Sequence, residues 1–246
     1  MHCATVILAL LLCAADARDS EYWKSRDFLR PQLDVDTRNR IDDLIELKKD
    51  QILKTAQRRK LFYQEAKPTA ALPKGQVLLL HDSLVTSWFW RAKHTMQTLA
   101  AFGFDTYAVD LPGHGRSTGN CKDSSCLEAL MKELRLTRPL LVSPKKAGKI
   151  SLELIAEKPE LLSGFVTVAP MGARGYDEEV LNKIKIPTLS LRGEWDAYYG
   201  KERAEKLDAM PNAQVIVFEK SNSRVYDIWP DKFNTLLVNF ASKVFS

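Results

Sequence analysis

The stretch that decides the fold is Ala108-Val109-Asp110-Leu111-Pro112-Gly113-His114-Gly115-Arg116-Ser117, an apolar run that passes directly into a polar turn. Two other junctions share this design: Val77-Leu78-Leu79-Leu80 precedes His81-Asp82, and Leu140-Leu141-Val142 precedes Ser143-Pro144-Lys145-Lys146-Ala147-Gly148. Such junctions are typical of buried strands that end in loops. The carboxyl ends of parallel strands share one edge of a sheet, so we expect the three turns to meet there.

Downstream of residue 60, short apolar runs alternate with longer stretches that have helical spacing. The runs cover 61–63, 77–80, 106–109, 140–142, 165–168, 188–191 and 215–218, and the helical stretches cover 88–101, 127–134, 146–157, 201–209 and 230–244. Buried strands joined by crossover helices predict an α/β fold, a mostly parallel sheet with helices on both faces. Only 15 residues run from Met171 to Lys185, too few for a lid domain.

The overall composition favours one folded domain with an appendage. The chain has 246 residues, 45% of them hydrophobic and 27% charged, which excludes a disordered, collagen-like or multispanning protein. The net charge of +5 is spread along the chain without a basic patch, so no nucleic acid partner is expected.

Residues 1–17 are predicted to be a secretory signal peptide. Thr5 to Ala15 are apolar, and Ala15-Asp16-Ala17 has the small-x-small pattern of a cleavage site. We therefore expect a secreted or lumenal protein. The apolar segment is too short for a stable membrane span, but the lack of Lys or Arg near Met1 leaves an uncleaved membrane anchor as an alternative.

Four cysteines bear on the same question. Cys3 and Cys13 would leave with the signal peptide, whereas Cys121 and Cys126 would remain. In an oxidising lumen these two can pair across a small loop, and two free buried thiols are the alternative.

Residues 18–50 are predicted to form a charged helical extension, followed by the main domain at 51–246. The segment from Arg18 to Lys60 contains 12 Lys and Arg and 9 Asp and Glu. After a potential cap at Asp36, an apolar stripe of Ile41, Leu44, Ile45 and Ile52 indicates an amphipathic helix. This helix either packs on the main domain or binds a partner.

Several ordered segments carry a family resemblance. They include Leu61–Ala66, the run ending at His81, Ala108–Gly113, Leu141–Pro144, Gly164–Val166 with Ala169-Pro170, and Pro187–Leu189 with Gly193-Glu194. Together they resemble the abhydrolase domain-containing protein 14 family (14A/14B) of the α/β-hydrolase superfamily. The resemblance runs from about Ile52 to the C-terminus, roughly four fifths of the chain.

The resemblance implies a catalytic triad whose members are only partly present here. It implies a serine nucleophile in a Ser-x-Ser-x-Ser elbow, an Asp after a later strand and a His after the last strand. The nucleophile position falls on Lys145, the acid position on Asp196 and the His position on Ser223. No histidine follows His114, and a serine at the base position cannot accept the nucleophile's proton near neutral pH. Ser143, two residues before the elbow centre, is expected to point into the turn.

The oxyanion hole is altered as well. This fold builds the hole from a backbone N–H after the nucleophile, at Lys146, and one from the loop after the first central strand. The family's His-Gly in that loop reads His81-Asp82 here, which places a carboxylate near the developing negative charge. Loss of nucleophile, base and a hole residue together predicts a catalytically inactive pseudoenzyme that acts by binding. The alternative is an active hydrolase or acyl transferase on small esters or acyl-lysines, as the resemblance implies.

Three roles for Lys145 remain open. Its ammonium group can fill the old site beside Asp196 or Asp82, its amine can form a Schiff base, or it can join Lys146 and helix N–H groups in an anion pocket. The first is favoured because the two carboxylates keep the amine charged. His81 and His114 are expected to stabilise their turns. No cofactor or metal is expected, and the partner is predicted to be a small anionic ligand or a protein.

Overall fold

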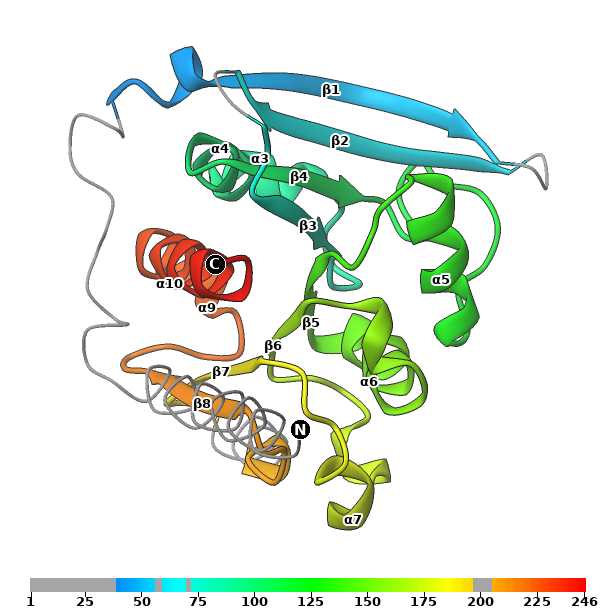
Figure 1. The fold of residues 1–246 in the computed structure, drawn as a ribbon, viewed down its shortest axis with the longest axis vertical. Coiled ribbons are helices and arrows are strands. Elements are labelled where there is room, and N and C mark those ends of the chain that lie inside the picture. Colours follow the sequence, from blue (N-terminus) through cyan, green and yellow to red (C-terminus); the bar gives the residue numbers. More distant parts are fainter. Residues whose placement is uncertain (1–38, 56–58, 70–71, 197–204) are drawn as a thin grey trace, which may run out of the picture.

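The protein was analysed as a computed structural model that describes residues 39–55, 59–69, 72–196 and 205–246. Its strands form one eight-stranded sheet in the order β1-β2-β4-β3-β5-β6-β7-β8, shown in Figure 1. The bounds are β1 Ile45–Lys54, β2 Lys60–Pro68, β3 Gly75–Leu79, β4 Phe104–Val109, β5 Leu140–Pro144, β6 Gly164–Val168, β7 Thr188–Gly193 and β8 Ala213–Phe218. β1 and β2 pair antiparallel, β2 pairs antiparallel with β4, and all the other neighbours are parallel.

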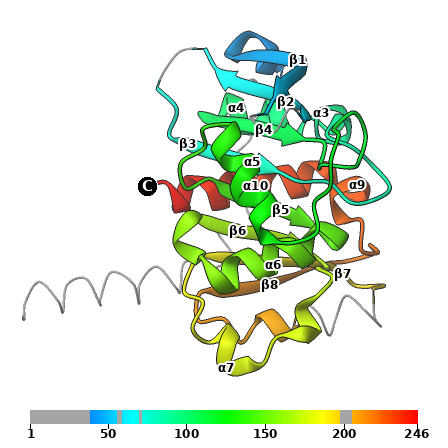
Figure 2. The same ribbon diagram turned by 90° about the vertical axis from the view of Figure 1, so that its right-hand side faces the viewer.

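Helices cover both faces of this sheet (Figures 1 and 2). The α-helices are α3 Trp88–Ala92, α4 Thr95–Ala101, α5 Ser124–Glu133, α6 Gly148–Glu157, α7 Glu178–Leu181, α9 Val225–Ile228 and α10 Pro230–Val244. Short 3-10 turns are η2 Ile41–Leu44, η3 Lys145–Ala147, η4 Pro159–Leu161 and η5 Ala173–Gly175. The connection from β6 to β7 holds only η5 and α7, and the predicted α/β-hydrolase fold without a lid domain is confirmed.

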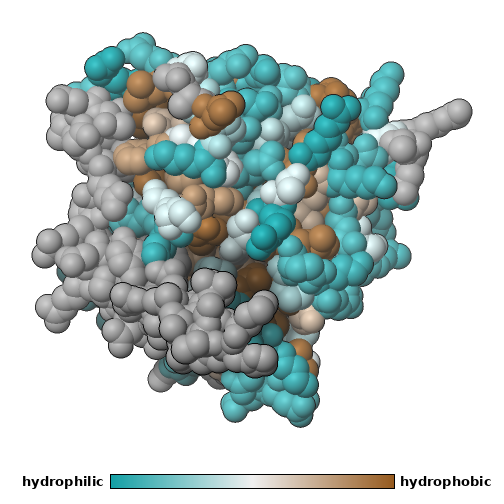
Figure 3. Space-filling view, viewed as in Figure 1, coloured by the Kyte–Doolittle hydropathy of each residue, from teal (hydrophilic) through white to brown (hydrophobic). Residues whose placement is uncertain are grey.

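The sheet separates two apolar clusters, one on each face. On one face, α3, α4, α9 and α10 bury Trp90, Tyr226 and Phe233 against the sheet, and the stacked rings of Trp90 and Phe233 lie 5.8 Å apart. On the other face, α5 and α6 contribute Leu127 and Leu154 to the second cluster. On the face shown in Figure 3, the coloured surface is largely hydrophilic, with hydrophobic residues gathered between the hydrophilic ones.

The expected helix around residues 36–52 is wrong for its described part. Ile41–Leu44 form one 3-10 turn, and the next ten residues form β1, the edge strand, so the boundary drawn between residues 50 and 51 cuts through a strand. A bulge between Lys48 and Gln51, with Asp50 at φ 55°, breaks the alternation that would have indicated a strand. Pairing with β2 decides the structure because β1 buries apolar residues only once it is paired.

The other segments mostly follow the expected pattern. All seven apolar runs are strands, and the helical stretch 88–101 is split into α3 and α4 by His94, whose φ is 56°. The stretch 201–209 lies partly outside the described residues, and the signal peptide 1–17 lies wholly outside them. Among the described residues, no helix has the length and apolar character needed to cross a membrane.

The structure of the turn after β4 explains the Asp and Gly residues in its sequence. The buried carboxylate of Asp110 accepts hydrogen bonds from the N–H groups of Ser87 (2.8 Å) and Arg116 (2.9 Å). Gly115 has φ 54° and packs so closely on Asp110 that an added Cβ would collide with the carboxylate. Asp110 therefore ties the loop after β4 to the start of α3, and this motif is structural.

Candidate functional site

The sharp turn after β5 has the geometry of a nucleophile elbow. β5 ends at Pro144, and Lys145 has φ 45°, a strained conformation for a residue with a side chain. The chain then enters η3 and α6. Gly148 allows the start of α6 to approach the loop after β6, because a Cβ there would come within 2.6 Å of Pro170. Lys145 thus stands where an α/β hydrolase presents its nucleophile.

The Lys145 side chain turns toward the loop after β3. Its Nζ lies 4.0 Å from Oδ2 of Asp82, at the limit of an ion pair, and the two side chains are 26% and 8% exposed. Among the described residues, no ion pair joins Lys145 to Asp196. Of the two predicted partners for the ammonium group, the structure places it beside Asp82.

Asp82 also occupies the region of the oxyanion hole. Its Oδ1 accepts a hydrogen bond of 2.8 Å from the N–H of Ser83, which belongs to the loop that would supply a hole donor. The same carboxylate lies near Tyr226 of α9. Burial raises the pKa of the Tyr226 phenol above its usual range, and the charge of Asp82 adds to this shift. Asp82 is therefore a buried carboxylate that occupies the N–H of Ser83 in the loop where this fold forms its oxyanion hole.

Asp196 and Ser223 lie on two loops that are bonded to each other. The N–H of Trp195 donates to the carbonyl of Ser221 at 2.9 Å, and Gly193 packs directly against the backbone of that second loop. Both side chains are partly exposed. The loops that carry the predicted acid and base positions are thus adjacent, and neither loop supplies an imidazole at the predicted base position.

His81 is held in a structural role. It is 1% exposed, its Nε2 accepts a hydrogen bond from the N–H of Leu111 (2.9 Å), and its Nδ1 lies 2.8 Å from the carbonyl oxygen of Asp82. Since Nε2 accepts, Nδ1 carries the proton and donates to that carbonyl. Burial lowers the pKa of His81. With both ring nitrogens bonded to backbone groups, His81 is not placed to accept a proton from a substrate.

Ser143 is buried beneath the elbow. It is inaccessible to solvent, and its hydroxyl group is hydrogen-bonded to the hydroxyl group of Ser151 on α6 at 2.7 Å. The same Ser151 Oγ lies 3.0 Å from the carbonyl oxygen of Ala147. This hydroxyl pair fastens β5 to α6. The expectation that Ser143 points inward agrees with this position.

A cavity of about 400 Å³ opens beside the elbow, on the side of the β4 loop. It is lined by His81, Ser83, Leu111, Cys121, Lys146 and Ile150, among others. Two further lysines, Lys122 and Lys149, also face it; sequence reasoning assigned no site role to either. Lys122 lies 23 residues before Lys145, the predicted site residue nearest to it in the sequence, and could not have been found without the fold. Among the described residues, no group of three His, Cys, Asp or Glu side chains could hold a metal ion.

Comparison with known proteins places the chain in a family. Residues 77–143 match the family model described as alpha/beta hydrolase family. The rat protein ABHD14A is 32% identical over 186 residues, which cover 73% of this chain and 77% of the rat protein. The chain belongs to the ABHD14 family. Human "Putative protein-lysine deacylase ABHD14B" is 31% identical over 188 residues, which cover 73% of this chain and 89% of that protein.

Solved structures agree on the α/β-hydrolase fold. A CIB-like hydrolase from Thermoplasma acidophilum superposes with a TM-score of 0.71 at 20% identity, covering 80% of this chain and 98% of that one. The carboxylesterase CesB from Bacillus subtilis gives a TM-score of 0.65 at 17% identity, covering 84% of this chain and 97% of that one. At these identities the likeness concerns architecture alone. Chemistry in this ABHD14 member has to be argued from its own side chains.

Proposed function

We propose that this ABHD14-family protein does not hydrolyse its ligand and acts by binding. The observation that carries the proposal is Lys145 at the centre of the elbow, with φ 45° and its ammonium group 4.0 Å from Asp82. The backbone geometry of a nucleophile is kept, but the side chain is an amine that lies beside a carboxylate at the outer limit of an ion pair. A protonated amine has no free electron pair with which to attack an acyl carbon.

No other residue supplies the missing alcohol and base. Ser143 is buried and hydrogen-bonded, so a substrate cannot reach it. Ser223 has the wrong chemistry for a base, and no histidine follows His114 in the sequence. His81 is occupied by two backbone bonds. Serine hydrolysis needs a hydroxyl hydrogen-bonded to an imidazole that can accept its proton, and the described residues around the elbow include no such pair.

Asp82 weighs against turnover independently. A tetrahedral intermediate carries a negative charge, and loss of one oxyanion donor costs about 100- to 1000-fold in rate. Here the N–H of Ser83, in the loop that supplies a hole donor in this fold, is bonded to the Asp82 carboxylate, which would also repel that charge. This effect remains even if some nucleophile were found.

The alternative is an active hydrolase or acyl transferase on small esters or acyl-lysines. It is supported by relatives that bear the name of a protein-lysine deacylase and are 31% identical. A Schiff base at Lys145 is a further route to covalent chemistry, and the nearby Asp82 disfavours it because a carboxylate stabilises the charged amine.

We propose further that the protein works in the secretory pathway lumen or outside the cell. The support is the bond between Cys121 and Cys126, since disulfides persist in oxidising compartments. An uncleaved N-terminal segment that anchors the protein to a membrane is the alternative.

Labelling with a fluorophosphonate probe tests the loss of hydrolysis. An active serine hydrolase is labelled in parallel as a control, and a restored chain carries Lys145→Ser, Ser223→His and Asp82→Gly. We expect no label on the wild-type chain, and labelling of the restored chain would show that the scaffold can still support the chemistry. Labelling of the wild-type chain, together with esterase turnover that is lost in Lys145→Ala, would overturn the proposal.

A further inference from the structure

The cavity beside the elbow lies where α/β sheets bind ligands. Its walls come from the loops after β3, β4 and β5, represented by Ser83, Leu111 and Lys146. β4 and β5 flank β3 on opposite sides, so the chain reverses its winding direction at this point of the sheet. A crevice forms outside the strands at such a switch point, and its volume of about 400 Å³ is in the range of small-molecule sites.

The charge of this cavity has one sign. Lys122, Lys146 and Lys149 contribute three ammonium groups to its lining, and no carboxylate is among the lining residues. Within the described parts of the chain, none of the three takes part in an ion pair. Their positive charges are therefore available to an anion, with no protein carboxylate to compete at the cavity itself.

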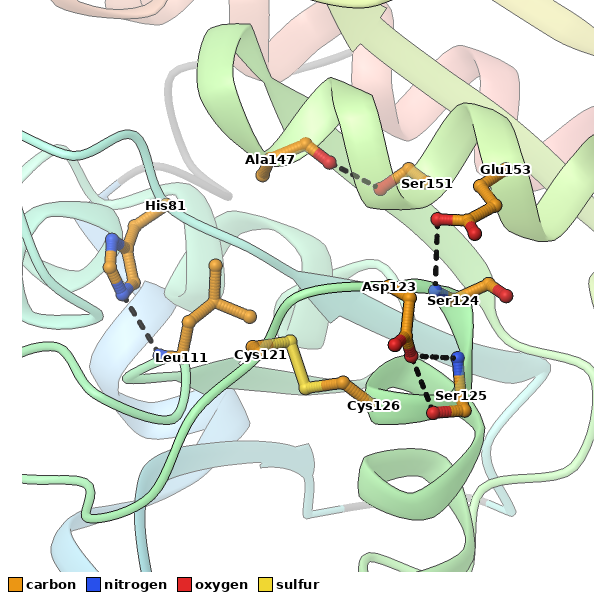
Figure 4. The surroundings of a disulfide bond; sticks show 10 residues. All are labelled: His81, Leu111, Cys121, Asp123, Ser124, Ser125, Cys126, Ala147, Ser151 and Glu153. Atoms are coloured by element: carbon orange, nitrogen blue, oxygen red, sulfur yellow. Dashed lines mark hydrogen bonds between the residues drawn. A yellow bond between two sulfur atoms is a disulfide. The ribbon is translucent and has the colours of Figure 1, made fainter.

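The inner wall is apolar. Leu111, Ala147 and Ile150 are buried residues of the lining, and the sulfur-bearing Cys121 lies alongside them. Figure 4 shows Leu111 between His81 and Cys121, with Ala147 at the start of the neighbouring helix. The lysines are more exposed than this wall. The cavity thus combines an apolar interior with a cationic rim.

One buried polar atom in the wall also lacks a partner. Nδ1 of His114, a lining residue, is buried and has no hydrogen-bond partner among the described residues. Buried polar atoms in folded proteins are nearly always satisfied by protein, water or ligand. The partner of this atom is therefore either water or a ligand in the cavity.

The position of Lys122 is fixed by a covalent loop. It lies between Cys121 and Cys126, whose Cα atoms are 5.3 Å apart. Asp123 caps α5 by accepting from the N–H of Ser125 at 3.1 Å. Ser124 binds α6 through its N–H to Glu153 and its hydroxyl to Glu157, at 3.2 and 2.9 Å (Figure 4 shows the first). The loop thereby brings Lys122 to α6, which carries Lys149.

From this geometry we infer that the cavity binds a small amphiphilic anion, a carboxylate or phosphate head attached to an apolar body. The inference rests on the proposed binding function and names its ligand class. The anion pocket considered from the sequence combined Lys145 with Lys146. In the structure Lys145 lies beside Asp82, and the lysines that line the cavity together with Lys146 are Lys122 and Lys149. The head group lies at the lysine rim and the apolar body lies against Leu111 and Ile150.

Isothermal titration calorimetry on the full chain tests the ligand class with three eight-carbon probes. Octanoate carries the charge and the apolar body, octanol lacks the charge, and octylammonium reverses it. We expect octanoate to bind and the other two to bind at least about tenfold more weakly, with octanoate affinity falling as NaCl rises. Inorganic phosphate, a head group without a body, is expected to bind more weakly than octanoate.

Variants locate the site. The double variant Lys122→Gln and Lys149→Gln removes two exposed rim charges outside the elbow, and we expect octanoate affinity to fall by about tenfold. The matched control Lys183→Gln removes an exposed lysine just after α7 that pairs with Glu179 and does not line the cavity, and it should leave affinity unchanged. Circular dichroism melts confirm that each variant is folded.

Contrary results separate this inference from the proposed function. Equal binding of octanol and octanoate, equal losses in the double variant and in Lys183→Gln, or no binding of any probe would overturn the anion site. Phosphate that binds as tightly as octanoate would overturn the amphiphilic class. Fluorophosphonate labelling detects an activated serine and does not depend on the rim lysines. It therefore tests the loss of hydrolysis independently of the calorimetry, which tests the anion site.

Discussion

Removing the disulfide should lower stability by an amount that follows from its loop length. Cys121 and Cys126 are five residues apart in sequence, so the bond closes a six-residue loop. The loop-closure relation gives about 2 kcal/mol of stabilisation for a loop of this size, mainly by restricting the unfolded chain. For a domain of this length each kcal/mol shifts Tm by about 2–4 °C, so the double variant Cys121→Ser, Cys126→Ser should melt about 4–8 °C lower.

Thermal unfolding with and without a phosphine reductant measures this effect. The reductant should lower the Tm of the wild-type chain to that of the double variant and leave the variant unchanged, which also controls for Cys3 and Cys13. Alkylation before reduction should leave Cys121 and Cys126 unmodified in a peptide mass map. If the wild-type Tm does not respond to the reductant and both cysteines are alkylated, the disulfide does not form and Cys121 and Cys126 are free thiols.

Three further predictions concern the site and its frame. Burial lowers the pKa of His81, so below pH 6.5 the unfolded chain binds a proton that the folded chain does not bind. The free energy of unfolding should therefore fall as the pH drops from 6.5 toward the folded pKa, by about 1.4 kcal/mol for each unit by which the two pKa values differ. In urea titrations, His81→Asn should flatten this part of the pH profile. Gly193→Ala should cost about 1–3 kcal/mol because its methyl group would meet backbone carbonyls of the adjoining loop, whereas Gly175→Ala, with nothing within 4 Å, should change the unfolding free energy by less than about 0.5 kcal/mol; equal effects would contradict the packing argument. A double-mutant cycle with Lys145→Met and Asp82→Asn should give a coupling energy below about 1 kcal/mol, since the pair is 4.0 Å apart and the lysine is a quarter exposed; a coupling above about 2 kcal/mol would mean a tighter pair than this geometry allows.

Much of the fold could be predicted because its signals are local. The central parallel strands are buried on both faces and therefore appear as continuous apolar runs, such as Phe165–Val168 within β6. The turns after these runs contain residues that are typical of tight turns, such as Gly115 at φ 54°. Lys145 and Asp196, which the family resemblance assigned to triad positions, follow β5 and β7, and the carboxyl ends of these strands share one edge of the sheet.

β1 could not be predicted because its structure depends on a partner. Its ten residues are half charged, and the bulge before Gln51 removes the alternation that identifies a half-buried strand. What remains, an apolar stripe through Ile41 and Ile45, fits a helix equally well when taken alone. Hydrogen bonding to β2 selects the strand, and that pairing is a property of the assembled sheet.

By itself, the sequence determined which chemical groups are missing: no amount of folding can put a hydroxyl on Lys145 or an imidazole on Ser223. Tertiary structure alone decided what the remaining groups do. It turned the Lys145 ammonium toward Asp82, bonded both nitrogens of His81 to backbone, paired Cys121 with Cys126, and gathered Lys122, Lys146 and Lys149 around one cavity. The reason is physical: side-chain identity is fixed residue by residue, whereas distance, burial and charge environment arise only when segments far apart in the chain pack together.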